Sequence, residues 1–205
     1  MTTIDLVRHG EVLTPDLYCA PADELLSKQG WAQLAPLKKY QGWDVVITSS
    51  STRCSAFATE LAGEQNLSLI IEPTFQELDF GDWTGRTRQS IWETDQTQLT
   101  ELWSNPLGFK APQGESMIAF IKRIESAWQA MLKQHQGKNI LLICHAGVIR
   151  AIASHALGLD YRHSQKLSVD YGRIHRLHCY DDNEVSLSGW NWSVAELSRN
   201  TPSNT

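Results

Sequence analysis

Two short stretches that lie far apart in this chain both end an apolar run in a histidine and a glycine. Residues 3–10 read TIDLVRHG, and residues 138–147 read KNILLICHAG. A neutral imidazole can attack an electrophile or accept a proton, and a protonated imidazole can bind an anion. The repeated ending therefore indicates that His9 and His145 belong to one chemical site.

Charged residues follow two other apolar runs in a similar way. Residues 44–48, DVVIT, are followed by three serines and then by Arg53, and residues 67–75, LSLIIEPTF, lead to Glu77. The carboxyl ends of parallel strands meet at one edge of a sheet, and ligands bind beyond that edge. If these runs are parallel strands, one site holds Arg8, His9, Arg53, Glu77 and His145.

This set of side chains suits a phosphoryl group. A guanidinium group can bind two phosphate oxygens at once through parallel hydrogen bonds. Helix N-termini predicted after Gly10, Ser51 and Gly147 would add partial positive charge. One neutral histidine could attack phosphorus in line and form a phosphohistidine. Glu77 could protonate the leaving alkoxide and then accept a proton from water. The residues alone leave open which histidine attacks.

The elements that must position these groups alternate along the chain. Apolar runs predict strands over 3–7, 44–48, 67–72 and 138–144, and a closing hairpin over 173–180 and 184–190. Helical patterns cover 26–40, 50–65 (opened by serine hydroxyl caps), 115–134 and 147–158. Strands that alternate with helices predict an α/β fold of three layers, in which helices cover both faces of a mostly parallel sheet.

The length of 205 residues suits one domain over residues 1–205. Residues 84–115 have poor sheet character and predict a small helical cap outside the sheet, and residues 198–205 predict a flexible polar tail. Trp92 and Trp103 lie in this cap, where they could stack on an aromatic group or pack the cap on the core.

Net charge, cysteine spacing and the motifs present limit the binding partners and cofactors expected for this protein. The net charge of −5 argues against nucleic-acid and membrane-surface binding. No secretory signal is visible, and the four cysteines are widely spaced, so we expect a cytoplasmic protein without a disulfide framework or zinc site. Phosphate-loop, zinc-protease and dinucleotide-binding motifs are absent from the sequence.

Four segments together resemble the signatures of the histidine phosphatase superfamily, which has the phosphoglycerate mutase-like fold. They are LVRHGE at 6–11, SSSTRCSAFA at 49–58, ELDFGDWTG at 77–85 and CHAGVIRA at 144–151. The resemblance implies that His9 is the phosphorylated nucleophile and that Glu77 is the proton donor. It also implies that Arg8, Arg53 and His145 bind phosphate with His9, and that neither a metal nor another cofactor is needed.

The resemblance extends loosely to the α-ribazole-5′-phosphate phosphatases, which remove a phosphate late in cobalamin synthesis. It rests on residues 80–85, 105–116 and 168–172. The chain departs from the family where Val12 and Pro15 replace a threonine and an asparagine that helps to hold the phosphoryl group, and where Thr84 replaces a common glutamate.

The expected partner is a small-molecule phosphate ester, and a homodimer formed through the exposed sheet edge stays open. Hydrolysis of a different small ester by the same chemistry is the nearest alternative. A mutase is less favoured because the chain is short for the cofactor-dependent phosphoglycerate mutases. A non-catalytic phosphate-binding module would need the cations, but it would not need His9 together with Glu77.

Overall fold

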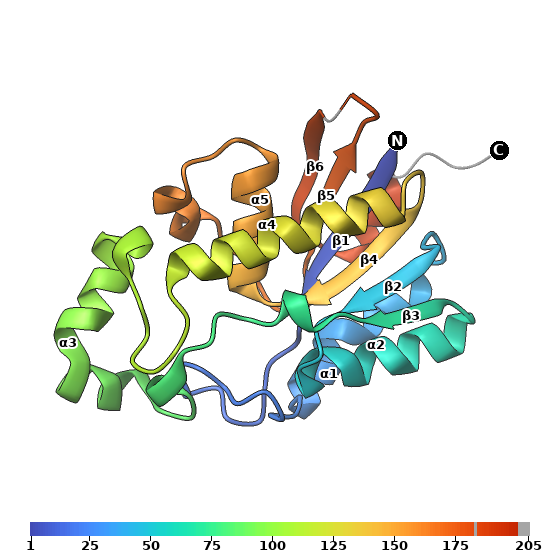
Figure 1. Cartoon of the computed structure of the whole chain (residues 1–205). Coiled ribbons are helices and arrows are strands. Elements are labelled where there is room, and N and C mark those ends of the chain that lie inside the picture. Colours follow the sequence, from blue (N-terminus) through green and yellow to red (C-terminus); the bar gives the residue numbers. More distant parts are fainter. Residues whose placement is uncertain (183, 201–205) are drawn as a thin grey trace.

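The predicted strands form one mixed sheet in the computed structural model, which describes residues 1–182 and 184–200. Across these residues the strand order is β3-β2-β4-β1-β5-β6 (Figure 1). Neighbouring strands among β1 to β4 run parallel, whereas β5 runs antiparallel to both β1 and β6. The strands are β1 (Thr2–Arg8), β2 (Val45–Thr48), β3 (Ser68–Ile71), β4 (Asn139–Cys144), β5 (Ile174–Cys179) and β6 (Val185–Trp192).

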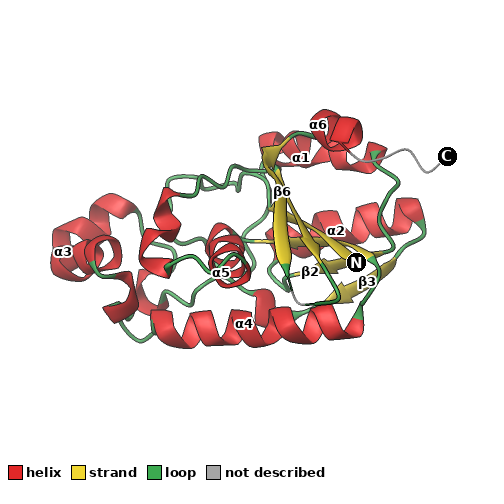
Figure 2. Ribbon diagram, turned by 90° about the horizontal axis from the view of Figure 1, so that it is seen from above, coloured by secondary structure: helices red, strands yellow, loops and turns green. Residues whose placement is uncertain are grey.

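Helices cover both faces of this sheet, as predicted. The α-helices are α1 (Lys28–Leu34), α2 (Thr52–Gln65), α3 (Arg88–Ser104), α4 (Met117–Gln134), α5 (Ala146–Ala156) and α6 (Val194–Asn200). Helices α4 and α5 pack on one face, while α1, α2 and α6 pack on the other (Figure 2). The α/β fold with a mostly parallel sheet is therefore confirmed. No helix within the described residues is both long and apolar enough to cross a bilayer.

The central strands are apolar without alternation because both of their faces are buried. On β1, Leu6 packs with α4 and α5, whereas Val7 packs with α2 on the opposite face. On β4, Leu142 and Ile143 divide between the two faces in the same manner. Continuous apolar runs are typical of strands buried in this way.

Two predicted elements differ in the structure. The helix expected over 26–40 leaves the α conformation after Leu34 and continues as a 3-10 helix over Ala35–Lys39. Pro36 accounts for this change, because its ring cannot donate the hydrogen bond of an α-helix interior and clashes with the preceding turn. The prediction of a helix N-terminus after Gly10 was wrong. In the part of the chain that the structure describes, the first helix begins at Lys28, and residues 11–27 form an irregular segment.

The segment predicted as a cap contains α3, which lies apart from the sheet (Figure 1). This helix is kinked at Asp95, where φ is −129° and ψ is 33°. Arg86 Nη1 lies 3.0 Å from the carboxylate of Asp95 and holds the kink. At the other end of the chain, the first three residues of the tail predicted over 198–205 belong to α6, and residues 201–205 lie outside the described residues. The single-domain boundary stays a prediction.

Candidate active site

Strand register places the two His-Gly endings side by side. Arg8 at the end of β1 pairs with Cys144 at the end of β4, and Thr48 at the end of β2 pairs with Ile143. The backbone N–H of His9 donates to the Cys144 carbonyl oxygen at 2.9 Å. The residues that follow these three strands therefore share one edge of the sheet.

A cavity of about 590 Å³ lies beyond this edge. Segments that are distant in the sequence meet around it, including the irregular segment 11–27, the segment that follows β3, and the start of α5. Its lining includes all five predicted residues, Arg8, His9, Arg53, Glu77 and His145. The sheet thus brings the predicted chemical groups together.

His9 is held as a neutral imidazole with one nitrogen free of the backbone. Its Nδ1 lies 2.7 Å from the Gly10 carbonyl oxygen, which can only accept, so Nδ1 carries the proton. The lone pair then resides on Nε2. Burial lowers the pKa of His9 well below the usual value, and Arg53 and Arg8 lower it further. Nucleophilic attack through Nε2 is the chemistry that this arrangement permits.

His145 lies beside His9, with the two ring centroids 5.3 Å apart. Nη2 of Arg53, which can only donate, lies 3.3 Å from His145 Nδ1. The opposite nitrogen, Nε2, therefore bears the proton and donates to Ser49 Oγ at 2.9 Å. Burial, followed by the charge of Arg53, lowers the pKa of His145 well below the usual value. Both histidines are consequently neutral at neutral pH.

Two guanidinium groups supply the positive charge of the cavity. Arg53 Nη1 donates to the Pro21 carbonyl oxygen at 2.7 Å, and Arg8 Nη1 donates to the Val169 carbonyl oxygen at 2.8 Å. The Arg8 guanidinium also lies 3.8 Å from the centre of the Tyr171 ring. Although burial lowers the pKa of Arg8, an arginine retains its charge at neutral pH.

Glu77 reaches the same cavity and rests against the first turn of α5. Its Oε2 accepts the Gly147 backbone N–H at 3.0 Å, and its Oε1 accepts the N–H of Leu78 at 3.2 Å. A Cβ atom built at Gly147 would lie 2.2 Å from Oε1. A side chain at this position would therefore displace the carboxyl group from its place in the cavity.

Two helix N-termini open toward the cavity. Ser51 is the N-cap residue of α2 and His145 is that of α5, and both line the cavity. Within the described residues, neither side chain makes a capping hydrogen bond, so the predicted hydroxyl cap of α2 was wrong. N–H groups at helix ends attract anions, and this adds to the field of the arginines.

Three further residues of the site were not predicted from the sequence as site residues: Ser49, Arg150 and Tyr171. Ser49 fixes the ring of His145, and its only signal was its place directly after β2. Arg150 lines the cavity one turn into α5, so the helical spacing from Ala146 could have found it. Tyr171 precedes β5, and the start of an antiparallel strand lies at the same sheet edge as the ends of the parallel strands.

The rest of the cavity wall is largely apolar. It includes Tyr18, Phe80, Leu102, Trp103, Met117 and Phe120. Trp92 and Trp103 on α3 are exposed to the same degree, at 46% and 47%, but only Trp103 lines the cavity. Val12, Pro15 and Thr84, the three departures from the family pattern, all line the cavity. Since proline has no side-chain donor, Pro15 does not reproduce the hydrogen bonding of an asparagine.

Comparisons with known proteins identify the family and the fold of this chain. A profile of the histidine phosphatase superfamily (branch 1) matches residues 4–193. The chain is 27% identical over 195 residues to the probable phosphoglycerate mutase GpmB of Escherichia fergusonii, covering 93% of this chain and 90% of the relative.

Solved structures show the same fold. The α-ribazole phosphatase of Shigella flexneri matches with a TM-score of 0.82 and 26% identity, over 93% of this chain and 96% of that one. The phosphoserine phosphatase of Entamoeba histolytica, solved with 3-phosphoglyceric acid, matches with a TM-score of 0.83 and 20% identity, over 94% and 98% of the two chains. By the profile match over nearly its whole length, the chain belongs to the histidine phosphatase superfamily.

Proposed function

We propose that the protein hydrolyses a small phosphomonoester through a phosphohistidine intermediate on His9. Support comes from one arrangement above all: a neutral imidazole with its Nε2 lone pair free of the backbone, placed in one cavity with two arginines and a carboxyl group. A site built only to bind phosphate would need the cations but neither the nucleophile nor the acid.

In the first step, His9 Nε2 forms a bond to phosphorus while the ester P–O bond breaks. Glu77 in its acid form gives its proton to the leaving oxygen, and the free alcohol departs. Arg8 and Arg53 stabilise the charge that spreads over the equatorial oxygens in the transition state. His145 lies beside His9 and can contact the same phosphoryl group.

In the second step, water attacks phosphorus and the N–P bond breaks. The Glu77 carboxylate accepts a proton from this water, which restores the acid for the next cycle. Inorganic phosphate leaves, and His9 returns to its neutral form. Each group thus ends the cycle in its starting state, and no metal-bound species is required by this sequence of steps.

The test is hydrolysis of phenyl phosphate by the wild-type protein and by His9→Ala, each with and without EDTA. We expect wild-type activity that EDTA does not change, and a loss of at least about 10³-fold in His9→Ala, since nucleophile removal abolishes the covalent route. Activity that EDTA removes, or that survives in His9→Ala, would contradict the proposal.

The preferred substrate in this proposal is α-ribazole 5′-phosphate, which would place the protein in cobalamin synthesis. Support comes from the apolar wall, where the aromatic side chains of Phe80 and Trp103 line the cavity and suit a benzimidazole ring. Similarity to the Shigella flexneri α-ribazole phosphatase at 26% identity points the same way.

A second candidate is a small phosphate ester that also carries a carboxylate, such as 3-phosphoglycerate. Arg150 favours it, because its guanidinium lines the cavity and its one hydrogen bond within residues 1–182 and 184–200 runs from Nε to the Leu167 carbonyl oxygen, at 3.0 Å. The remaining donors suit a bidentate carboxylate. The similarity to proteins named phosphoglycerate mutase is consistent with this candidate.

Two variants separate these candidates when kcat/KM is compared for the two esters. If α-ribazole 5′-phosphate is the substrate, Trp103→Ala lowers its kcat/KM by about tenfold, the value of one aromatic stacking contact, and Arg150→Gln has little effect. If the carboxylated ester is the substrate, Arg150→Gln costs about 10- to 100-fold, as for a charge-assisted pair, and Trp103→Ala has little effect.

A further inference from the structure

The segment that carries Glu77 has little regular structure of its own. After β3, a short 3-10 helix covers Pro73–Phe75, and residues 76–80 belong to no helix or strand. Irregular backbone needs hydrogen-bond partners from elsewhere in the fold. The position of the Glu77 carboxyl group therefore depends on what holds this segment.

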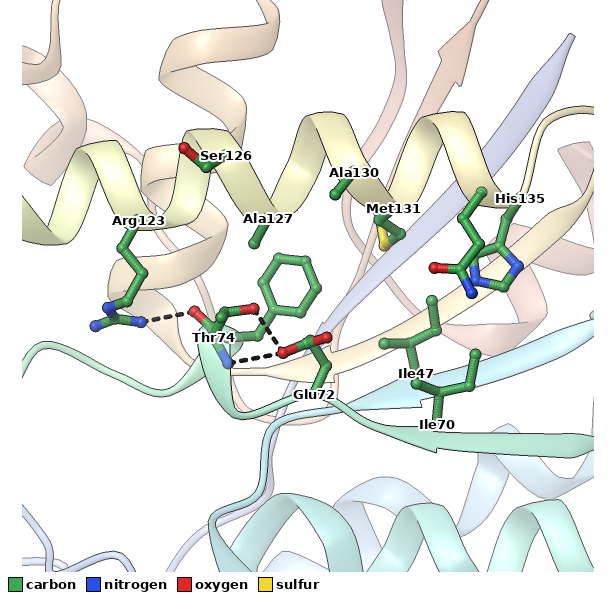
Figure 3. A pocket seen from close by; sticks show the side chains of 12 residues that line it. Ile47, Ile70, Glu72, Thr74, Arg123, Ser126, Ala127, Ala130, Met131 and His135 are labelled. Carbon is green, nitrogen blue, oxygen red and sulfur yellow. Dashed lines mark hydrogen bonds between the residues drawn. The ribbon is translucent and has the colours of Figure 1, made fainter.

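Arg123 on α4 holds the segment from one side. Its Nη1 donates to the carbonyl oxygens of Thr74 at 2.6 Å and Gln76 at 3.0 Å, and its Nη2 lies 3.4 Å from the Glu77 carbonyl oxygen. Figure 3 shows Arg123 reaching from α4 to Thr74 at the end of a second cavity, of about 350 Å³.

Glu115 completes the arrangement. Its two carboxylate oxygens accept Nε of Arg123 at 3.0 Å and Nη2 at 2.7 Å. All five guanidinium N–H donors of Arg123 are then engaged. The backbone of Glu115 also donates to the Asp79 carbonyl oxygen at 2.9 Å, so the pair secures the chain on both sides of Glu77.

The segment separates two cavities. Glu72, Thr74 and Phe75 line the cavity of Figure 3, whereas Gln76, Glu77 and Leu78 line the active-site cavity. Arg123 is absent from the lining of the active-site cavity and lies behind the segment. Its hydrogen bonds to the Glu77 segment go to the backbone, and it does not line the cavity in which the substrate would react.

We infer that Arg123, together with Glu115, is a positioning residue that sets the Glu77 carboxyl group for proton transfer to the leaving group. This inference rests on the proposed role of Glu77. Lysine cannot replace the arginine, because a single ammonium cannot span three carbonyl oxygens and a carboxylate. Loss of the pair should therefore lower kcat/KM most for esters whose leaving group has to be protonated.

The experiment compares kcat/KM for two esters that differ in their need for an acid. Phenyl phosphate has a poor leaving group and needs the proton, while dinitrophenyl phosphate has a good one and does not. The ratio kcat/KM reports formation of the phosphoenzyme alone, so slow dephosphorylation does not obscure it. Glu77→Gln sets the pattern expected when the acid is lost.

In Arg123→Met, which keeps an unbranched side chain but removes the guanidinium, we expect kcat/KM for phenyl phosphate to fall about 10- to 100-fold, the cost of a misplaced catalytic group. For dinitrophenyl phosphate we expect a fall of less than about threefold, because that reaction bypasses the acid. Arg123→Lys should resemble Arg123→Met. Glu115→Gln should show the same selective loss at about 3- to 10-fold, in case Arg123→Met does not fold.

Arg86→Met is the matched control. Arg86 is exposed to a similar degree as Arg123, at 29% against 26%, and holds Asp95, Ser90 and Thr94 of α3 instead of the Glu77 segment. In Arg86→Met, the ratio of kcat/KM for phenyl phosphate to kcat/KM for dinitrophenyl phosphate should equal that of the wild type. If the folded Arg123 and Glu115 variants lose kcat/KM equally for both esters, the inference is overturned but the proposed function is not. A wild-type protein inactive on both esters would overturn the proposed function, and the inference with it.

Discussion

At the scale of single residues, a serine and a glycine position two of the candidate catalytic groups. The ring of His145 takes its orientation from Ser49, and the carboxyl group of Glu77 rests against Gly147. Both contacts depend on tertiary structure, so the sequence could identify Glu77 and His145 as candidates but could not show the contacts that orient them. The two His-Gly endings could be assigned to one site from the sequence because the carboxyl ends of parallel strands lie at the same edge of a sheet.

Gly147→Ala separates stability from activity. Alanine favours the helix by up to about 1 kcal/mol, yet its Cβ would lie 2.2 Å from Glu77 Oε1 and displace the carboxyl group. We expect kcat/KM for phenyl phosphate to fall about 100-fold, as for a catalytic group moved by about 1 Å, with little change in Tm.

Gly63→Ala is the control for that measurement. Gly63 lies within α2, and a Cβ added there meets no atom within 4 Å. It should raise Tm by a few degrees, through about 0.5–1 kcal/mol of helix propensity, and leave kcat/KM unchanged. If Gly147→Ala retains full activity, close contact between Gly147 and Glu77 is not needed for the reaction.

At the scale of elements, the sequence predicted what depends on apolar periodicity and missed what depends on contacts between elements. The strands and α4 follow from runs and spacing in the chain. The segment 11–27 does not, because isolated bridges from Val12 to Leu26 and from Leu17 to Thr87 hold it in place over the cavity. Such bridges join residues whose proximity only the folded chain creates.

The segment 168–172, which precedes β5, is another such element. Asn191 Nδ2 and Trp190 Nε1 of β6 donate to the Ser168 carbonyl oxygen at 3.1 and 2.6 Å. The Gly172 N–H donates to the Arg8 carbonyl oxygen at 3.1 Å. The antiparallel hairpin therefore presents Tyr171 as a flat support beneath the Arg8 guanidinium.

We expect Tyr171→Leu to weaken competitive inhibition by inorganic phosphate about 3- to 10-fold, because a cation–π contact worth about 1 kcal/mol is lost. Tyr171→Phe keeps the aromatic face and should match the wild type. Inhibition constants measured at one ionic strength provide the comparison. An unchanged constant in the leucine variant would show that the ring does not support Arg8.

At the scale of the whole molecule, several buried histidines make stability depend on pH. His175 on β5 is buried against Trp190, and its Nδ1 accepts the Asn191 N–H at 3.4 Å. Burial, with a smaller effect of Arg150, lowers its pKa from 6.5 to about 3. As pH falls below 6.5, the unfolded chain binds a proton that the folded chain does not, so stability declines until about pH 3.

This linkage gives a measurable slope. Between about pH 7.5 and about pH 5, His175 alone should reduce the free energy of unfolding by about 2 kcal/mol. His175→Asn keeps an acceptor for the Asn191 N–H but does not titrate, so its loss over the same range should be smaller by about that amount. Urea unfolding at both pH values tests this, and an equal loss in both proteins would contradict the assignment.

The central claim is that His9 carries the phosphoryl group between substrate and water. The most direct measurement uses Glu77→Gln with dinitrophenyl phosphate, a pair in which the intermediate should form without acid help and hydrolyse slowly. The reaction is quenched in alkaline denaturant, which preserves phosphohistidine, and the peptides are sequenced by tandem mass spectrometry. We predict one phosphoryl group, on His9. Turnover without any phosphorylated peptide, or with the phosphoryl group on another residue, would contradict the account.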